Sequence, residues 1–119
     1  MIFTQWVVGP QLIGLIILIV GYVMKRFPPK RINSLYGYRT AASMKNQQTW
    51  DEANNYSTKL MIKAGLIAIL PGLIMAAIIP IKYEFVMAMA ALLAVIGITT
   101  TLLVCTEKHL KKIFDDKTE

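Results

Sequence analysis

The side chains best suited to recognising a ligand are gathered in residues 25–63, a long polar stretch with an apolar run on each side. Arg39 can hold a phosphate or a carboxylate through two parallel hydrogen bonds. Trp50 can lie at the level of lipid headgroups, with its ring buried and its N–H in water. The stretch is either a loop anchored to lipid phosphates or a shaped recognition site for a peptide, a headgroup or a partner protein. Further donors and acceptors come from Asn33, Ser34, Tyr36, Tyr38, Thr40, Asn46, Gln47 and Gln48.

Two features predict that this stretch has a fixed shape. Pro28 and Pro29 should end the preceding helix and stiffen the exit from it. Gly37, between Tyr36 and Tyr38, is predicted to have a positive φ or to make a close backbone contact.

The rest of the chain offers no catalytic chemistry. The sequence has one cysteine and one histidine, and it lacks a nucleophilic triad, a metal-ligand cluster and a Gly-rich phosphate loop. Asp51 and Glu52 are adjacent, so on a helix they point about 100° apart and are poorly placed as an acid–base pair. Cys105 is interpreted as a small apolar filler and His109 as a surface residue. We therefore predict a protein that is not an enzyme and that uses no cofactor or metal.

The elements that position these residues are predicted to be membrane helices. The chain is 55% hydrophobic and only 17% charged, against about a quarter charged in soluble domains, and its apolar residues form blocks. Three blocks, at about 6–24, 60–79 and 85–106, have lengths close to the ~20 residues that cross a hydrocarbon core. The predicted fold is one all-α integral membrane domain, with three transmembrane helices and a short juxtamembrane or interfacial helix.

Local signals refine the first two spans. Gly9 and Pro10 are expected in the first turn of the first helix, where proline is tolerated. Gly14 and Gly21 share one face, which would let another helix approach closely. Residues 44–60 should form a short surface helix, or else the water-facing start of the second span. The start of that helix would be capped by Ser43, or by Thr49 with Glu52 three residues later.

The basic residues predict the orientation. Eight of the thirteen Lys and Arg lie in residues 25–63 and four lie in the tail, 107–119. By the positive-inside rule, the loop 25–59 and the tail are cytoplasmic and the N-terminus is outside. Basic residues beside apolar spans are partners for anionic lipid headgroups, and this placement argues against a nucleic-acid partner.

A motif in the loop resembles a known family. Asn33-Ser34-Leu35-Tyr36-Gly37-Tyr38-Arg39-Thr40, followed by Thr49-Trp50, is similar to the signature of the SdpI family of bacterial membrane proteins. The resemblance implies a multi-pass protein of the cytoplasmic membrane. The founding member gives immunity against a secreted toxic peptide and holds a transcriptional repressor at the membrane, and it is longer, with additional N-terminal spans. The motif positions, expected to bind a ligand or partner, are Asn33, Tyr36, Gly37, Arg39, Thr40 and Trp50.

Three functions follow as hypotheses. The first is an immunity or resistance factor against a secreted membrane-active peptide, which uses the loop 32–50 for recognition. The second is an accessory or scaffold subunit that binds a membrane-protein partner or anionic lipid. The third is a small transporter built from several copies of the chain, with a polar path made by Gln11, Thr99–Thr101 and the break at Pro71. No ionised residue lies deep in a span, which argues against a self-contained pump.

Overall fold

The computed structural model describes residues 4–115, and every regular element within them is a helix. The all-α class expected from the sequence is therefore confirmed for the described chain. The order is α1 (Thr4–Val7), α2 (Pro10–Arg26), α3 (Gln47–Ile78), a 3₁₀ turn (Ile81–Tyr83), α4 (Glu84–Leu110) and a π-helical turn (Lys111–Asp115).

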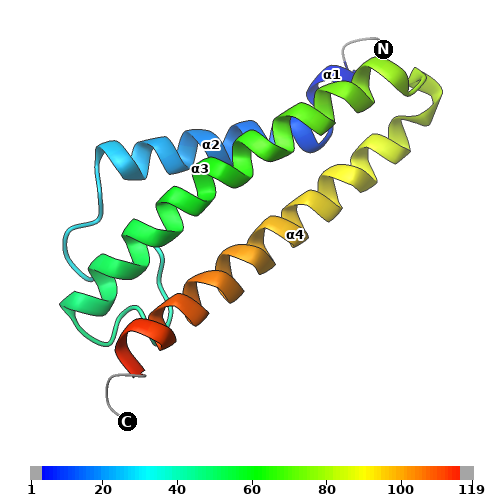
Figure 1. Ribbon diagram of the computed structural model, residues 1–119. Coiled ribbons are helices and arrows are strands. Elements are labelled where there is room, and N and C mark those ends of the chain that lie inside the picture. The colour runs from blue at the N-terminus through cyan, green and yellow to red at the C-terminus, as the bar shows by residue number, and fades with distance from the viewer. Residues whose placement is uncertain (1–3, 116–119) are drawn as a thin grey trace.

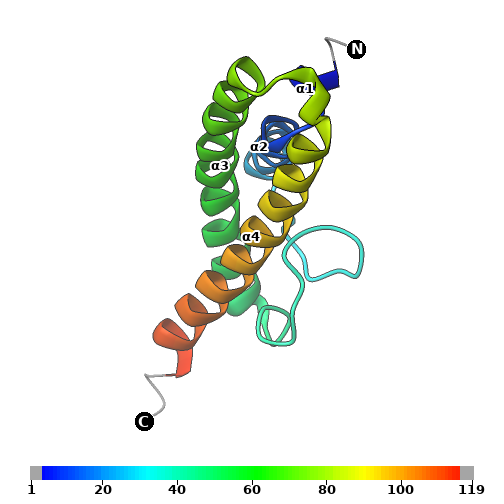
Figure 2. The same cartoon turned by 90° about the vertical axis from the view of Figure 1, so that its right-hand side faces the viewer.

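The three long helices pack side by side (Figure 1 and Figure 2). α2 makes its most extensive contact with α3, and it also contacts α4. The loop between α2 and α3 lies at the same end of the molecule as the C-terminal end of α4, and the α3–α4 turn lies at the other end (Figure 1). The predicted loop and tail therefore share one end.

Two glycines bring the backbones of α2 and α3 into contact. A Cβ atom at Gly14 would lie 2.7 Å from the carbonyl oxygen of Gly65, and a Cβ at Gly65 would lie 2.7 Å from that of Gly14. Gly21 packs in a similar way against Met61 and Ile62. The close approach predicted for the face of Gly14 and Gly21 is confirmed, and the helix that approaches is α3.

The N-terminal segment differs from the single helix predicted over about 6–24. α1 ends at Val7 and α2 begins at Pro10, so the helix is interrupted at Gly9. Proline is well placed at the start of α2, because its missing N–H would have had no helical partner there. In a continuous helix, the same ring would clash with the preceding turn. The α2 helix then ends at Arg26, before the two prolines, as predicted.

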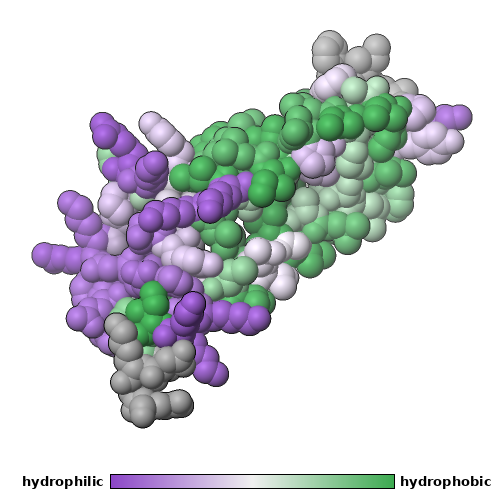
Figure 3. Space-filling view, viewed as in Figure 1, coloured by the Kyte–Doolittle hydropathy of each residue, from purple (hydrophilic) through white to green (hydrophobic). Residues whose placement is uncertain are grey.

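Two helices are long and apolar enough to cross a membrane: α3 and the continuous stretch Glu84–Phe114. Their most apolar windows are only 17% and 0% buried inside the protein. In a soluble protein, the apolar face of such a helix would be mostly covered. Hydrophobic residues cover the middle of the visible face, and hydrophilic residues gather at the end with the loop (Figure 3). The shorter α2 has 17 residues, which is about 25 Å of helix.

The separate interfacial helix predicted over 44–60 is not formed. α3 runs without a break from Gln47 to Ile78, through Pro71 in its interior. The polar segment is therefore the beginning of the same helix that continues as the apolar second span, which was the alternative interpretation of the sequence.

The N-cap of α3 is Asn46, so the prediction of Ser43 or Thr49 was wrong. The side-chain oxygen of Asn46 accepts a hydrogen bond from the Thr49 backbone N–H at 2.9 Å. The Thr49 hydroxyl accepts one from the Asn46 backbone N–H at 3.1 Å. This is a capping box in which threonine occupies the position that glutamate or glutamine usually takes.

Of the polar groups considered for a transport path, Gln11 and the break at Pro71 lie together, because Gln11 packs against Gly72, but the threonines of α4 do not join them. The threonines of α4, residues 99–101, are exposed, and the Thr101 hydroxyl donates to the Gly97 carbonyl at 2.7 Å. This is a bond to the helix's own backbone, as is usual for threonine within a helix. Gln11 is buried at 6% exposure, and Pro71 is exposed. Within one copy of the chain, these groups therefore do not line one path.

Candidate functional site

The loop between α2 and α3 is shaped by its own side chains. The Asn33 side-chain oxygen accepts hydrogen bonds from the backbone N–H of Leu35 at 2.9 Å and of Tyr36 at 2.6 Å. Its amide nitrogen donates to the Arg31 carbonyl at 2.9 Å. The Tyr36 hydroxyl donates to the Phe27 carbonyl at 2.6 Å, which ties the loop back to the end of α2. Asn33 thus forms an Asx-type turn, and Tyr36 closes the loop behind it.

Gly37 has both properties predicted for it. Its φ is +113°, a conformation that residues with a Cβ rarely adopt. A Cβ there would also lie 2.7 Å from the side-chain oxygen of Asn54 and 2.9 Å from a ring carbon of Pro29. A larger residue would therefore push the loop away from α3.

The first turns of α3 form a buried base under the loop. Trp50 is 0% exposed, and its indole N–H donates to the Pro29 carbonyl at 2.6 Å. The expectation that this N–H lies in water was wrong, because the loop folds over the ring. Asn54 is 5% exposed, accepts from the Tyr38 backbone N–H at 2.6 Å and donates to the Trp50 carbonyl at 2.9 Å.

Two further side chains of α3 hold the loop by its main chain. Gln47 donates to the Lys30 carbonyl at 2.6 Å. The Thr49 hydroxyl donates to the Ser43 carbonyl at 3.0 Å. We call these four side chains, Gln47, Thr49, Trp50 and Asn54, the α3 seat.

Thr40 takes part in a reciprocal pair of bonds with Ser43. The Ser43 hydroxyl accepts from the Thr40 backbone N–H at 2.8 Å, and the Thr40 hydroxyl accepts from the Ser43 backbone N–H at 3.2 Å. The Ser43 side chain is 0% exposed and also lies 3.0 Å from the Tyr38 carbonyl, to which it donates. These bonds fix the path of the chain between Gly37 and the start of α3.

The outer side of the loop carries the groups that a ligand could reach. Leu35 is 89% exposed, and Arg39 is exposed. One guanidinium nitrogen of Arg39 donates to the Ser34 carbonyl, which places the cation beside Leu35 on the outer side of the loop. We call Ser34, Leu35, Tyr36 and Arg39 the loop tip. An apolar group next to a cation can contact an amphipathic partner through both parts at once.

The C-terminal end of α4 lies close to the loop and to the first half of α3. Burial, and then the charge of Glu107, raises the pKa of Tyr38 to about 12. The His109 ring stacks on Tyr56 with 4.1 Å between centroids, and its Nε2 lies 2.7 Å from a carboxylate oxygen of Glu52. The interpretation of His109 as a solitary surface residue was therefore wrong. It joins the end of α4 to the first half of α3.

The predicted motif residues thus lie together, five in the loop and Trp50 directly beneath it. The structure places most of them in shaping roles, and Arg39 is the one that reaches outward most clearly. Sequence reasoning did not single out Asn54 as part of the site. The signal was its position four residues after Trp50, which puts both on one side of a helix. Within the described side chains, no group of three or more His, Cys, Asp or Glu could hold a metal ion.

Comparisons with known proteins identify relatives of this chain. The sequence profile of the SdpI/YfhL protein family matches residues 30–105. The chain belongs to the SdpI/YfhL family. YfhL of Bacillus subtilis (strain 168), described as an uncharacterized protein, is 44% identical over 98 residues, which cover 82% of each chain. No solved structure matches the chain.

The region matched by the SdpI/YfhL profile corresponds to the loop, α3 and most of α4. It begins in the loop, includes all of α3 and ends at Cys105, near the C-terminal end of α4. The loop tip, the α3 seat and the helix that carries Tyr56 therefore all lie within it. The resemblance to SdpI that the loop motif suggested is confirmed.

Proposed function

We propose that this protein is an immunity-type factor of the cytoplasmic membrane, which protects its cell against a secreted, membrane-active peptide that the loop tip contacts. Membership of the SdpI/YfhL family supports an immunity-type role. The observation that carries the role of the loop is the contrast in exposure between Leu35, at 89%, and Trp50 beneath it, at 0%. An exposed apolar side chain beside the Arg39 guanidinium, on a buried and hydrogen-bonded base, gives a partner two kinds of contact at a fixed position.

We also propose that α2, α3 and α4 all cross the membrane, with the N-terminus outside. The two basic segments, residues 25–63 and 107–119, hold twelve of the thirteen Lys and Arg. The hydrophilic end of the molecule is the end that carries the loop and the C-terminal end of α4 (Figure 3). The positive-inside rule puts this end in the cytoplasm. A peptide that has entered the bilayer would then meet the loop tip at the inner leaflet.

A survival assay tests the proposal. A deletion strain and its complemented parent are exposed to a panel of secreted membrane-active peptides, and surviving colonies are counted. We expect the deletion strain to be sensitive to at least one of them. Unchanged sensitivity across the panel, in a parent shown to express the protein, would refute the immunity role.

Variants of the tip then test the role of the loop. Leu35→Ser and Arg39→Ala should each lower survival by about tenfold or more, since each removes a main contact, with the same amount of protein in the membrane. Lys45→Ala is the matched control, because Lys45 is an exposed cation of the same loop outside the tip. If Arg39→Lys protects as well as the parent, the two-bond recognition by the guanidinium is wrong.

A second candidate is an accessory subunit of a larger membrane protein. The observation that favours it is the apolar surface of α4, none of which is buried in its most apolar window. A photo-crosslinker in place of Tyr36, used in cells without a toxin, would attach to a protein partner. Recovery of lipid or of the chain itself alone would count against this candidate.

A further inference from the structure

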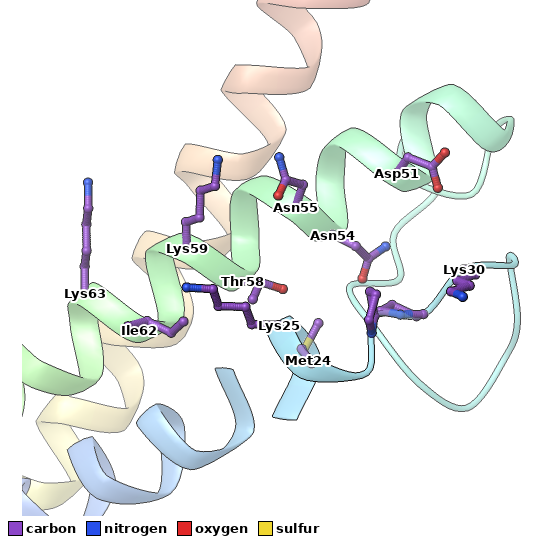
Figure 4. Close-up of a pocket in the computed structure, with 12 residues that line it drawn as sticks. Met24, Lys25, Lys30, Asp51, Asn54, Asn55, Thr58, Lys59, Ile62 and Lys63 are labelled. Carbon is purple, nitrogen blue, oxygen red and sulfur yellow. The ribbon is translucent and has the colours of Figure 1, made fainter. Parts of the chain in front are cut away.

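A second feature lies beside the loop and includes one residue of the α3 seat, Asn54, in its lining. A groove of about 710 Å³ separates the end of α2 from the first half of α3. Its lining is basic: Lys25 comes from α2, Lys59 and Lys63 come from α3, and Lys30 comes from the loop, with Asp51 as the one acidic residue. Figure 4 shows Lys59 and Lys63 extending from the same side of α3, and Lys25 at the end of α2 facing that helix.

Among the residues that the structure describes, the lysines of the groove have no acidic ion-pair partner. Among the described side chains, the one ion pair joins His109 to Glu52. The Asp51 carboxylate accepts a hydrogen bond from Gln47 at 2.7 Å. Lys59 and Lys63 are one helical turn apart, where like charges repel each other. The four lysines that line the groove therefore favour an anionic ligand.

The same groove continues onto an apolar surface. Met24 and Ile62 line it together with the lysines. Further along α3, Leu66 is 55% exposed and Leu70 is 64% exposed. They follow Lys63 by three and by seven residues, so all three share one side of the helix. A ligand that fills this surface would have an anionic head and a hydrocarbon tail.

We propose that this groove binds an anionic phospholipid, with its phosphate among Lys25, Lys59 and Lys63 and its acyl chains along Leu66 and Leu70. Basic pockets between membrane helices on the cytoplasmic side recognise such headgroups. Lysine suits the position of Lys63 within the span, because its stem can lie along apolar surface while its ammonium group reaches the headgroup layer. The site uses neither the loop tip nor a toxin, so it does not depend on the proposed function.

Lipid binding by the purified full-length chain in detergent tests the site. Native mass spectrometry measures the retention of phosphatidylglycerol and of zwitterionic phosphatidylcholine over a titration. We expect preferential retention of phosphatidylglycerol. The double variant Lys59→Gln with Lys63→Gln should weaken it about thirtyfold, and the two changes to Arg should preserve it. All these side chains are exposed, and circular dichroism checks that the helices remain.

The matched control is Lys108→Gln with Lys112→Gln. It removes the same charge at the same spacing from exposed positions outside the groove. Its affinity for phosphatidylglycerol should stay within about threefold of the parent. Equal loss in both double variants would show diffuse surface charge, and equal retention of phosphatidylcholine would show no headgroup recognition. Displacement of the lipid by glycerol 3-phosphate at a similar concentration would show a site for a free phosphate ester. Each of these three results would overturn the proposal.

Discussion

The hydrogen bond from Trp50 to the Pro29 carbonyl gives the most direct test of the loop's architecture. The substitution Trp50→Phe keeps an aromatic ring under the loop but removes the N–H that donates at 2.6 Å. Pro29 is buried, so its carbonyl would lose its partner without gaining water. Leaving a buried acceptor unpaired costs about 1–3 kcal/mol, and the lost ring volume costs about 1 kcal/mol more.

Limited trypsin digestion in detergent measures how much more easily the loop opens in the variant. Lys30 and Arg31 are exposed, and they follow Pro29 directly, so cleavage after them reports opening of the loop from the α3 seat. The two costs together are about 2–4 kcal/mol, and a loss of even about 2 kcal/mol in the free energy of local opening raises the cleavage rate about thirtyfold. Trp6→Phe is the matched control, because Trp6 is 44% exposed and belongs to α1.

The same control variant supplies a second measurement. Because the chain has two tryptophans, Trp50 is the only one left in Trp6→Phe. Its fluorescence should then resist quenching by iodide, as expected for a side chain at 0% exposure. If Trp50→Phe is cleaved no faster than Trp6→Phe, or if iodide quenches Trp50 as readily as free indole, the loop does not rest on this residue.

Three further predictions concern the loop and its orientation. Gly37→Ala should destabilise the loop by about 2 kcal/mol, because it strains the backbone at φ +113° and crowds Asn54, and faster hydrogen exchange of the Tyr38 N–H would report this. Gly97→Ala, where a Cβ meets nothing within 4 Å, is the control and should leave that exchange unchanged. The raised pKa of Tyr38, about 12 against 10.0, means that its contribution to stability is fully present below about pH 10 and is lost as the pH rises through 12. Tyr38→Phe should abolish this dependence in thermal melts, and an absorbance titration that finds an ordinary phenol pKa would contradict it. Leu35→Cys in a Cys105→Ala background should react with an impermeant maleimide in inverted vesicles and not in intact cells, and the opposite pattern would reverse the proposed orientation.

Local chemistry explains which parts of the fold the sequence predicted correctly. The end of α2 before Pro28 and the positive φ of Gly37 each depend on the covalent properties of one residue. The close approach at Gly14 depends on the absence of a side chain, which is also visible in the sequence. Such features do not depend on where the rest of the chain lies.

Several features that the sequence did not predict depend on contacts between residues far apart in the chain. The Trp50 indole N–H donates to the carbonyl of Pro29, twenty-one residues earlier, and the loop covers the ring. The Asn54 side chain accepts from the Tyr38 backbone N–H, so the loop covers this residue as well. His109 meets Glu52 across a separation of fifty-seven residues. A helical pattern cannot show that a polar face will be covered by its own loop. The signal available in the sequence was the position of Asn54 four residues after Trp50, which puts both on one side of the helix.

The α3 seat grips the main chain of the loop, at the carbonyls of Pro29, Lys30 and Ser43, instead of the side chains at its tip. Substitutions at Leu35 or Arg39 would therefore leave these anchoring bonds in place. If the loop tip binds the proposed target, point mutations there would change the contacts with the target while the scaffold persists. The same division makes the loop a platform onto which new binding residues could be grafted.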